Sequence, residues 1–404
     1  MTAFFKQLGP GLIFAGAAIG VSHLVQSTRA GADFGFGLVW ALLLVNMCKY
    51  PFFQFGPRYA MATGESLLEG YKKLGKGVLW TYYILTFATM FTIQTAVTIV
   101  TAGIASSLFG DFISTEVWTV IILTICFGIL FKGRYSVLDK LMKVIVLTLT
   151  ISTLVSVIIA LTNTSNPIDF AQKLPTNTLE IGFLIAFMGW MPAPLDISIW
   201  HSLWALEKQK DNTSYSVKSS LFDFNIGFMS TIILGICFIA LGTLVMHHSG
   251  ESFSASATQF SNQLITCYTK NLGNWAYIII GLAAFTTMFS TTLTTLDASP
   301  RSMDKATELL FEKRSKHGYL LWMIALTLGT LGIFFFLNSE MGLLIYIATI
   351  LSFLTAPFYA ISNYILISGK HTPKDWQPSL KLHILSWVGI LFLIGFSIWY
   401  LTTL

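Results

Sequence analysis

Three side chains that could hold a metal ion stand beside points where the apolar sequence is interrupted. His23 offers an imidazole nitrogen, Met191 a thioether sulfur and Asp196 a carboxylate oxygen. Donors of these kinds together suit a transition metal such as zinc, copper or iron. Simpler interpretations stand beside this one, because a lone histidine often hydrogen-bonds to a neighbouring helix and Asp196 could cap the helix that follows it.

Hydroxyl side chains form a second group of possible ligands, crowded into one apolar segment. Its members are Thr286, Thr287, Ser290, Thr291, Thr292, Thr294 and Thr295. In a membrane helix, serine and threonine commonly donate to a carbonyl of their own helix, which is the simplest interpretation of this group.

The chain that carries these residues is too apolar for a water-soluble protein. Of its 404 residues, 54% are hydrophobic and 11% are charged, whereas soluble chains carry about 25% charged residues. A soluble enzyme is therefore excluded, and the lipid bilayer is the expected partner. Basic residues are scattered over short connectors, so nucleic acid is not expected. No GxxxxGK[ST] motif occurs, which argues against a role for ATP.

Eleven long apolar runs predict an all-α integral membrane protein with eleven transmembrane helices in a single domain, 1–404. The expected spans are 10–31, 35–57, 78–107, 115–131, 141–162, 179–204, 222–247, 274–297, 318–336, 342–369 and 380–402.

The lysines and arginines predict how these spans are oriented. When the connectors are assigned alternately to two sides, twenty of the 24 basic residues fall on one side. The other side receives Arg29, Lys173 and Lys270, and Lys49 lies within the second span. Because basic connectors stay in the cytoplasm, we expect a cytoplasmic N-terminus and an external C-terminus in the cytoplasmic membrane.

Two of the expected spans contain residues that interrupt a helix. The first has Gly16, Gly20 and Ser22 near its middle, and the sixth has Gly189 followed by Met191-Pro192-Ala193-Pro194. Two prolines this close cannot both lie in an unbroken helix, since each lacks an amide hydrogen. Interruptions at corresponding positions of two halves are typical of an inverted repeat with a binding site at the breaks.

The repeats follow from the span count. Each interrupted span precedes four others, which predicts one repeat at about 8–162, a second at about 178–370 and an extra helix at about 380–402.

Several motifs resemble the Nramp family of divalent-metal transporters. Gly9-Pro10-Gly11-Leu12 and the run Ala30-Gly31-Ala32-Asp33-Phe34-Gly35-Phe36 are similar to the first span of that family, Met191-Pro192 with His201-Ser202 to its sixth, and Pro357-Phe358 to its tenth. The resemblance covers spans one to ten. It implies a LeuT-type fold with helices one and six broken, and secondary transport of a metal cation by alternating access without a resident cofactor.

The residues at the family's metal site differ in this chain. Aligned on the flanking glycines, the family's aspartate falls on Gly20 and its asparagine on His23. The sixth-span methionine corresponds to Met191, with Pro194 as an alternative because the interval to His201 is longer than in the family. The resemblance thus implies an altered site. The expected substrate-binding residues are Gly20, Ser22, His23, Met191, Asp196 and Thr355, and the expected metal ligands are His23, Met191 and Asp196.

The family's proton pathway is not recognisable either. Its third-span acids correspond to Gln94 and Val97, which carry no proton. In LeuT-type folds, hydroxyls of the eighth span bind sodium, so the resemblance implies Ser290, Thr291 and Thr294 as a possible sodium site.

Two further interpretations remain at this stage. Lys49 would extend its ammonium group to the membrane boundary. The helix ends at the two breaks would also suit a small organic or anionic solute, driven by sodium or uncoupled, as the alternative to a metal cation.

Overall fold

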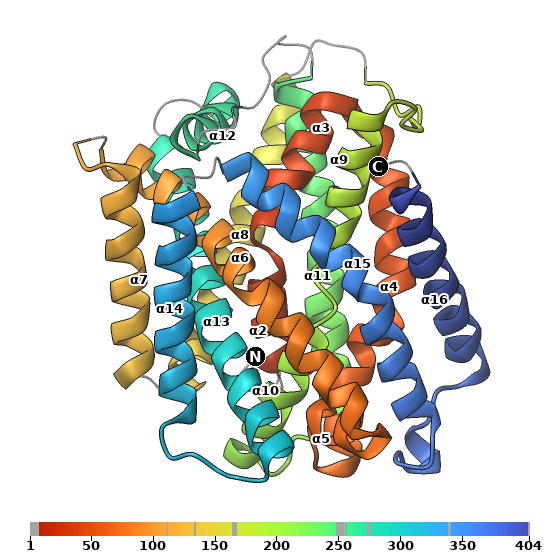
Figure 1. The fold of residues 1–404 in the computed structure, drawn as a ribbon. Helices are drawn as coiled ribbons and strands as arrows, with labels where there is room; N and C mark the ends of the chain where they lie inside the picture. The colour runs from red at the N-terminus through yellow and green to blue at the C-terminus, as the bar shows by residue number, and fades with distance from the viewer. Residues whose placement is uncertain are drawn as a thin grey trace.

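A computed structural model of the chain describes residues 8–110, 112–132, 135–163, 168–247, 254, 257–272, 276–337 and 341–402. Within these ranges the chain forms a bundle of helices (Figure 1). The first half contains α2 (Pro10–Ala18), the π-helix η1 (Ser22–Ser27), α3 (Thr28–Phe34), the 3₁₀-helix η2 (Gly35–Leu38), α4 (Val39–Thr63), α5 (Leu67–Leu74), α6 (Lys76–Phe109), α7 (Thr115–Lys132) and α8 (Tyr135–Asn163). The second half contains α9 (Thr178–Trp190), α10 (Ile197–Asp211), α11 (Val217–Val245), α12 (Ala257–Leu272), α13 (Ala276–Phe311), α14 (Gly318–Leu337), α15 (Met341–Ser368), η3 (Lys374–Trp376) and α16 (Leu380–Leu401).

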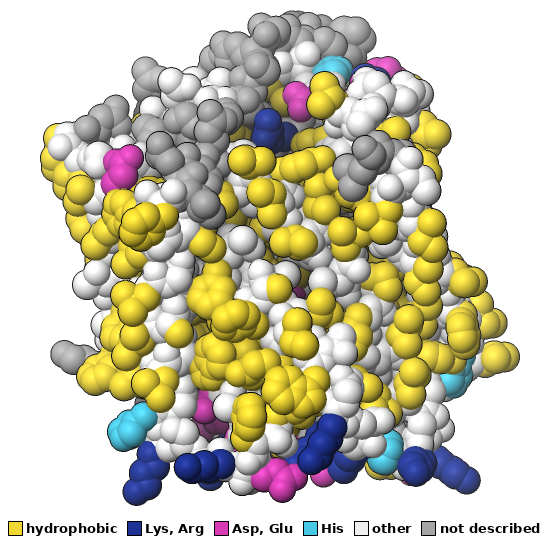
Figure 2. All heavy atoms as spheres, viewed as in Figure 1, with side chains coloured by type: hydrophobic (Ala, Val, Ile, Leu, Met, Phe, Trp, Pro, Cys, Tyr) yellow, Lys and Arg dark blue, Asp and Glu magenta, His cyan; other side chains and the backbone are white. Residues whose placement is uncertain are grey.

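The all-helical membrane fold expected from the sequence is confirmed. Each expected span overlaps a helix or a pair of helices, and seven of the described helical stretches are long and apolar enough to cross a membrane on their own. Hydrophobic side chains cover the sides of the molecule, whereas Lys, Arg, Asp and Glu gather at the end that contains α5 (Figure 2). We call this the α5 end and the opposite one the α3 end.

The expected boundaries were wrong where helices continue outside the apolar runs. The eighth span was expected to end at residue 297, but α13 continues to Phe311. The connectors also contain two short helices that were not expected, α5 and α12. Helix α5 is strongly amphipathic, and a capping box between Ser66 and Glu69 starts it. Apolar run length therefore underestimates helix length at membrane surfaces.

Both expected interruptions are present. Helix α2 ends at Ala18, Ile19 has a non-helical ψ of 74°, and the π-helix η1 begins at Ser22. The sixth span stops at Trp190 and resumes at Ile197, with a cis peptide bond before Pro192 in the unwound segment. In Figure 1 the four half-helices α2, α3, α9 and α10 lie within the bundle, with α3 and α9 at one end and α10 at the other. The division into repeats remains a prediction.

Helix α11 holds the first half-helix α2 in place through a buried carboxylate. The Asp223 side chain is 0% exposed and accepts hydrogen bonds from the amides of Gly9 (3.1 Å) and Gly11 (2.8 Å). It also accepts one from the Tyr215 hydroxyl at 3.0 Å. The first amides of a helix have no partner in their own helix, and their partial positive charge favours an anion. Asp223 therefore acts as an external cap for α2.

Two glycines let these helices approach closely. A Cβ added to Gly11 would overlap the backbone of Asp223, and one added to Gly227 would overlap the carbonyl oxygen of Gly11. Each residue of the Gly-Pro-Gly sequence at residues 9–11 thus has a local role. The Gly9 amide donates to Asp223, the proline occupies the first helical position, and Gly11 lets the two backbones touch.

We expect Asp223→Ala to destabilise the protein by about 3 kcal/mol, because it leaves two buried amides and a tyrosine hydroxyl without their acceptor. The melting temperature of the purified protein in detergent, followed by tryptophan fluorescence, measures the effect. Asp211→Ala, which removes an exposed carboxylate at the end of α10, is the control. Equal melting temperatures for the two variants would contradict the capping role.

Candidate functional site

A small cavity lies between the two interrupted spans. Its volume is about 30 Å³, and α2, η1, α6, α9, α10 and α13 contribute to its wall. The wall is mostly apolar; its polar members are Ser22, Asp196, Thr291 and Thr295, together with the indoles of Trp190 and Trp200. In secondary transporters with discontinuous helices, the substrate site lies at the breaks.

Asp196 supplies the negative charge of this cavity. It lies at the end of the unwound segment, directly before α10, and is 6% exposed. The side chain makes no capping hydrogen bond to α10, and its Oδ1 atom has no hydrogen-bond partner in the described structure. A buried carboxylate oxygen without a partner is costly. A cation bound beside this carboxylate would offset that cost.

Ser22 joins the two breaks. Its hydroxyl donates to the Ala18 carbonyl at 2.6 Å and lies 3.4 Å from the Pro192 carbonyl oxygen in the sixth span. The first residue of η1 therefore touches the unwound segment across the cavity. Gly20 stands beside it, and a Cβ there would come within 2.7 Å of the Thr291 hydroxyl oxygen.

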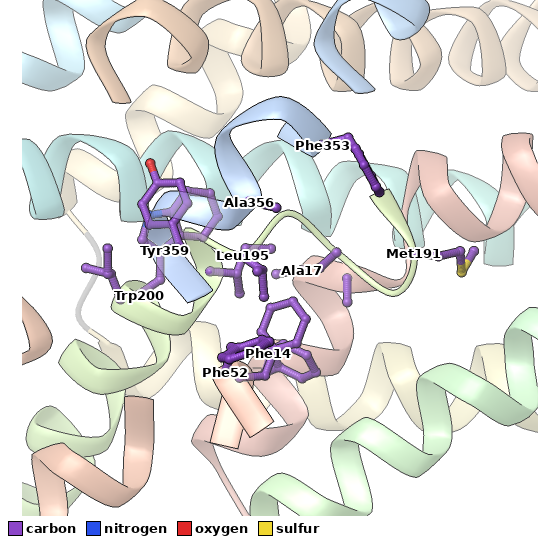
Figure 3. Close-up of a cluster of buried hydrophobic side chains, with 14 of the residues drawn as sticks. Phe14, Ala17, Phe52, Met191, Leu195, Trp200, Phe353, Ala356 and Tyr359 are labelled. Atoms are coloured by element: carbon purple, nitrogen blue, oxygen red, sulfur yellow. The ribbon is translucent and has the colours of Figure 1, made fainter. Parts of the chain in front are cut away.

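His23 and Met191, expected with Asp196 as metal ligands, are placed elsewhere. The His23 ring is fully buried, with Nε2 3.0 Å from the Thr231 carbonyl oxygen and Nδ1 2.7 Å from the Ser22 hydroxyl. Among the described residues, those that line the cavity include neither His23 nor Met191. Figure 3 shows Met191 at the opposite end of the unwound segment from Trp200. Of the three, the structure brings only Asp196 to the cavity.

The hydroxyl-rich segment lies on α13. Some of its hydroxyls donate only to their own helix, and one also reaches the first span. Ser290 and Thr294 donate to carbonyls of their own helix, at 2.7 Å each. Thr291 lines the cavity, and its hydroxyl lies 3.2 Å from both the Gly16 carbonyl in α2 and the Thr287 carbonyl. Thr355 donates to α15 itself and is not among the described cavity residues. Among the described hydroxyls of this segment, that of Thr291 hydrogen-bonds to the first span.

The positions that correspond to the family's third-span acids also lie near the centre. Val97 lines the cavity with an apolar side chain. Gln94 is fully buried and donates to the Thr292 carbonyl at 3.3 Å, which joins α6 to α13. Neither side chain can accept a proton from the cavity.

The interpretation of Lys49 as a residue at the membrane boundary was wrong. Its side chain is 0% exposed, and Nζ donates to the carbonyl oxygens of Met188 (2.9 Å), Gly189 (2.7 Å) and Met191 (2.9 Å). The sequence contained a signal for this burial, since Lys49 lies well inside an apolar span. Charged residues at that depth are seldom exposed to lipid.

His201 is also buried, and its ring packs against several aromatic side chains. Its imidazole is 0% exposed and stacks on Phe14, with ring centroids 5.6 Å apart. Phe224 and Trp204 contact the ring from other sides. In the described structure neither ring nitrogen has a hydrogen-bond partner.

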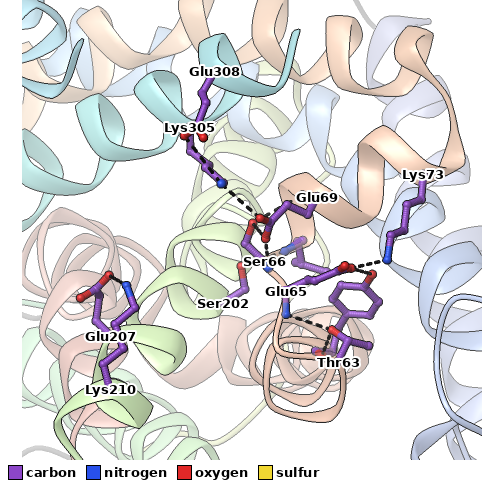
Figure 4. A network of polar contacts seen from close by, with 12 residues as sticks. Thr63, Glu65, Ser66, Glu69, Lys73, Ser202, Glu207, Lys210, Lys305 and Glu308 are labelled. Carbon is purple, nitrogen blue, oxygen red and sulfur yellow. Dashed lines mark hydrogen bonds and ion pairs between the residues drawn. The ribbon is translucent and has the colours of Figure 1, made fainter. Parts of the chain in front are cut away.

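Charged residues tie helices together at the α5 end (Figure 4). Lys305 of α13 forms an ion pair with Glu69 of α5 at 3.1 Å, and the Ser202 hydroxyl of α10 accepts a hydrogen bond from the Leu67 amide. Burial would raise the pKa of the Glu69 carboxyl, but its hydrogen bonds with Ser66 and Lys305 keep that pKa below its usual value. A polar cavity of about 470 Å³ adjoins these residues. The α5 end is thus closed by polar contacts between α5, α10 and α13.

Comparison with solved structures identifies the fold. The Eremococcus coleocola manganese transporter, in one variant, superposes with a TM-score of 0.73 at 12% identity, covering 98% of this chain and 86% of that one. MhsT in complex with L-phenylalanine gives a TM-score of 0.66 at 14% identity over 97% and 98% of the two chains. Mhp1, a nucleobase-cation-symport-1 family transporter, gives 0.61 at 14% identity over 98% and 93%. The chain therefore has a LeuT-type fold.

Sequence comparison agrees with the fold. An uncharacterised protein of Pasteurella multocida is 36% identical over 98% of this chain and 91% of its own length. Residues 11–403 match the family described as natural resistance-associated macrophage protein-like. With its two broken spans and these matches, the chain belongs to the Nramp family of multi-pass membrane transporters.

Proposed function

We propose that this protein is a secondary transporter that moves a metal cation across the membrane by alternating access, with Asp196 as the countercharge in the central cavity. The observation that carries the proposal is the buried carboxylate of Asp196, which lines the cavity and whose Oδ1 atom has no hydrogen-bond partner in the described structure. A cation at that place would offset the cost of the buried negative charge.

The chemistry of the wall supports a cation that prefers oxygen ligands. Besides Asp196, the cavity offers the hydroxyls of Ser22, Thr291 and Thr295, while the sulfur of Met191 and the ring of His23 lie outside its described wall. Carboxylate and hydroxyl oxygens favour magnesium or manganese over softer metals. The relative from Eremococcus coleocola is named a manganese transporter. A volume near 30 Å³ suits one ion rather than a larger solute.

The arrangement around the cavity is consistent with alternating access. The unwound residues at both breaks let each half-helix tilt separately from its continuation. On the α5 side, the contacts of Glu69 with Lys305 and of Leu67 with Ser202 would have to separate to open a path. The Glu69–Lys305 ion pair is partly exposed, and such pairs are weak enough to break and re-form in a transport cycle.

A small organic cation is the second candidate cargo. The indoles of Trp190 and Trp200 and the apolar remainder of the wall would suit an alkylammonium ion, whose charge is attracted to aromatic faces. An anionic solute fits less well, because the Asp196 carboxylate would repel it.

Replacing the carboxylate tests the proposal. We expect Mn²⁺ or Mg²⁺ to raise the melting temperature of the wild-type protein and Asp196→Asn to abolish this shift. Uptake of the ion into proteoliposomes should fall at least about tenfold, the change that corresponds to about 1.4 kcal/mol of lost binding. Asparagine has nearly the same shape as aspartate, so the variant should keep the fold. Its melting temperature without metal also reports the loss of the charge that attracts the Lys49 ammonium.

The control for this variant is Asp33→Asn, which neutralises an exposed aspartate of α3. Equal metal shifts in Asp196→Asn and wild type would refute the role of Asp196. A shift produced by methylammonium or ethylammonium but by no divalent salt would replace the metal by the organic cation.

We propose that transport is coupled to sodium and that the Thr291 hydroxyl is one ligand of this ion. Its hydroxyl, the Gly16 carbonyl and the nearby Thr287 carbonyl are the kind of oxygen ligands that sodium binds, whereas Ser290 and Thr294 donate to their own helix.

We expect an inward sodium gradient to accelerate uptake by the wild-type protein and to have little effect on Thr291→Val, which lacks the hydroxyl. Thr286→Val, altered at an exposed position of the same helix, should respond as the wild type does. The measurement is initial uptake in proteoliposomes with and without the gradient. Uptake by the wild type that ignores sodium would exclude this coupling.

A further inference from the structure

We propose that the Lys49 ammonium is a tethered cation that permanently fills a cation site built from the backbone carbonyls of the broken sixth span. The site lies beside the transport cavity but does not depend on the identity of the cargo, because its ligands and its cation all belong to this chain.

The sequence explains why the carbonyl oxygens of Met188 and Gly189 have no hydrogen-bond partner within their own helix. Met188 and Gly189 lie in the last turn of α9, where carbonyl groups have no amide four residues ahead within the helix. The residue four positions after Met188 is Pro192, which has no amide hydrogen at all. With no water at membrane depth, these oxygens need another donor.

Lys49 of α4 provides that donor. Nζ lies 2.7–2.9 Å from the carbonyl oxygens of Met188, Gly189 and Met191, and 3.4 Å from that of Ala193. An ammonium group carries three N–H donors, which matches the three short contacts. The side chain is 0% exposed, so no water competes for them.

The surroundings favour a positive charge. The C-terminal end of a helix carries a partial negative charge, and four carbonyl oxygens around one centre are the ligands that a sodium or potassium ion would take. Asp196, in the same unwound segment, adds an opposite charge that attracts the ammonium electrostatically. Lys49 therefore occupies, by covalent attachment, a site that would otherwise require an ion from solution.

Two consequences follow for transport. The unwound conformation of residues 191–196 does not depend on dissolved monovalent cations. The carbonyls of Met188, Gly189 and Met191 are also unavailable to the cargo, so a transported cation has to be selected by Asp196 and the cavity hydroxyls. Lys49 is thus a positioning residue that shapes the site without touching the cargo.

Removal and replacement of the ammonium group tests the proposal without any transport assay. We expect Lys49→Ala to lower the melting temperature, and ammonium or methylammonium chloride to restore at least half of the loss, because the small ion can enter the vacated space. Tetramethylammonium chloride at the same concentration controls for ionic strength, because this ion has no N–H group to donate and is too bulky for the vacated space. The wild-type melting temperature should not change among these salts.

Lys210→Ala is the control. The Lys210 side chain is exposed at the end of α10, where its ammonium pairs with Glu207 at 2.8 Å. This variant should not respond to methylammonium.

Lys49→Met separates charge from volume, since methionine fills similar space without a donor. A Lys49→Met protein as stable as the wild type, or a Lys49→Ala protein that no small ammonium ion stabilises, would overturn the proposal. If Lys49→Ala cannot be purified without added salt, it is extracted with and without methylammonium: recovery of folded protein only with the ion supports the tethered cation, and recovery in neither case refutes it. Failure of Asp196→Asn to alter metal binding would leave these outcomes unchanged, so the two proposals fail separately.

Discussion

The structure depends on how backbone groups are paired where helices stop inside a membrane protein. Water cannot satisfy them there, so every free amide or carbonyl needs a partner from the chain. Two buried charged side chains meet this need: the Asp223 carboxylate accepts from the first amides of α2, and the Lys49 ammonium donates to the last carbonyls of α9. Each charge has the sign that the helix end favours. Lys49 acts at the interruption of the sixth span, whereas Asp223 acts at the start of the first span.

The same constraint explains why Asp196 stands out. Its carboxylate lies in the same unwound segment, yet Oδ1 has no hydrogen-bond partner in the described structure. Its neighbours in the cavity wall are largely alanine, valine, isoleucine and tryptophan side chains, which offer it little compensation. A buried carboxylate oxygen without a hydrogen-bond partner is the kind of group found where binding requires a charge.

Much of the fold could be predicted from the sequence, because run length, prolines and glycines act locally. The apolar runs located the spans, and Pro192 located the sixth break to within a few residues. The site was less accessible, since side-chain direction depends on helix rotation. His23 stands one residue after Ser22 but faces α11 rather than the cavity. Lys49 was misjudged because its ligands come from residues about 140 positions away, which no local pattern reveals.

The glycine contact between α2 and α11 has a mechanical consequence. Because the two backbones touch at Gly11 and Gly227, sliding one helix along the other would bring backbone atoms into collision there. Asp223 fastens the same pair at the start of α2. Any tilting of α2 must then move α11 with it as a rigid unit. The chain then bends at Ile19 and Gly20, just beyond the section where the two helices are joined.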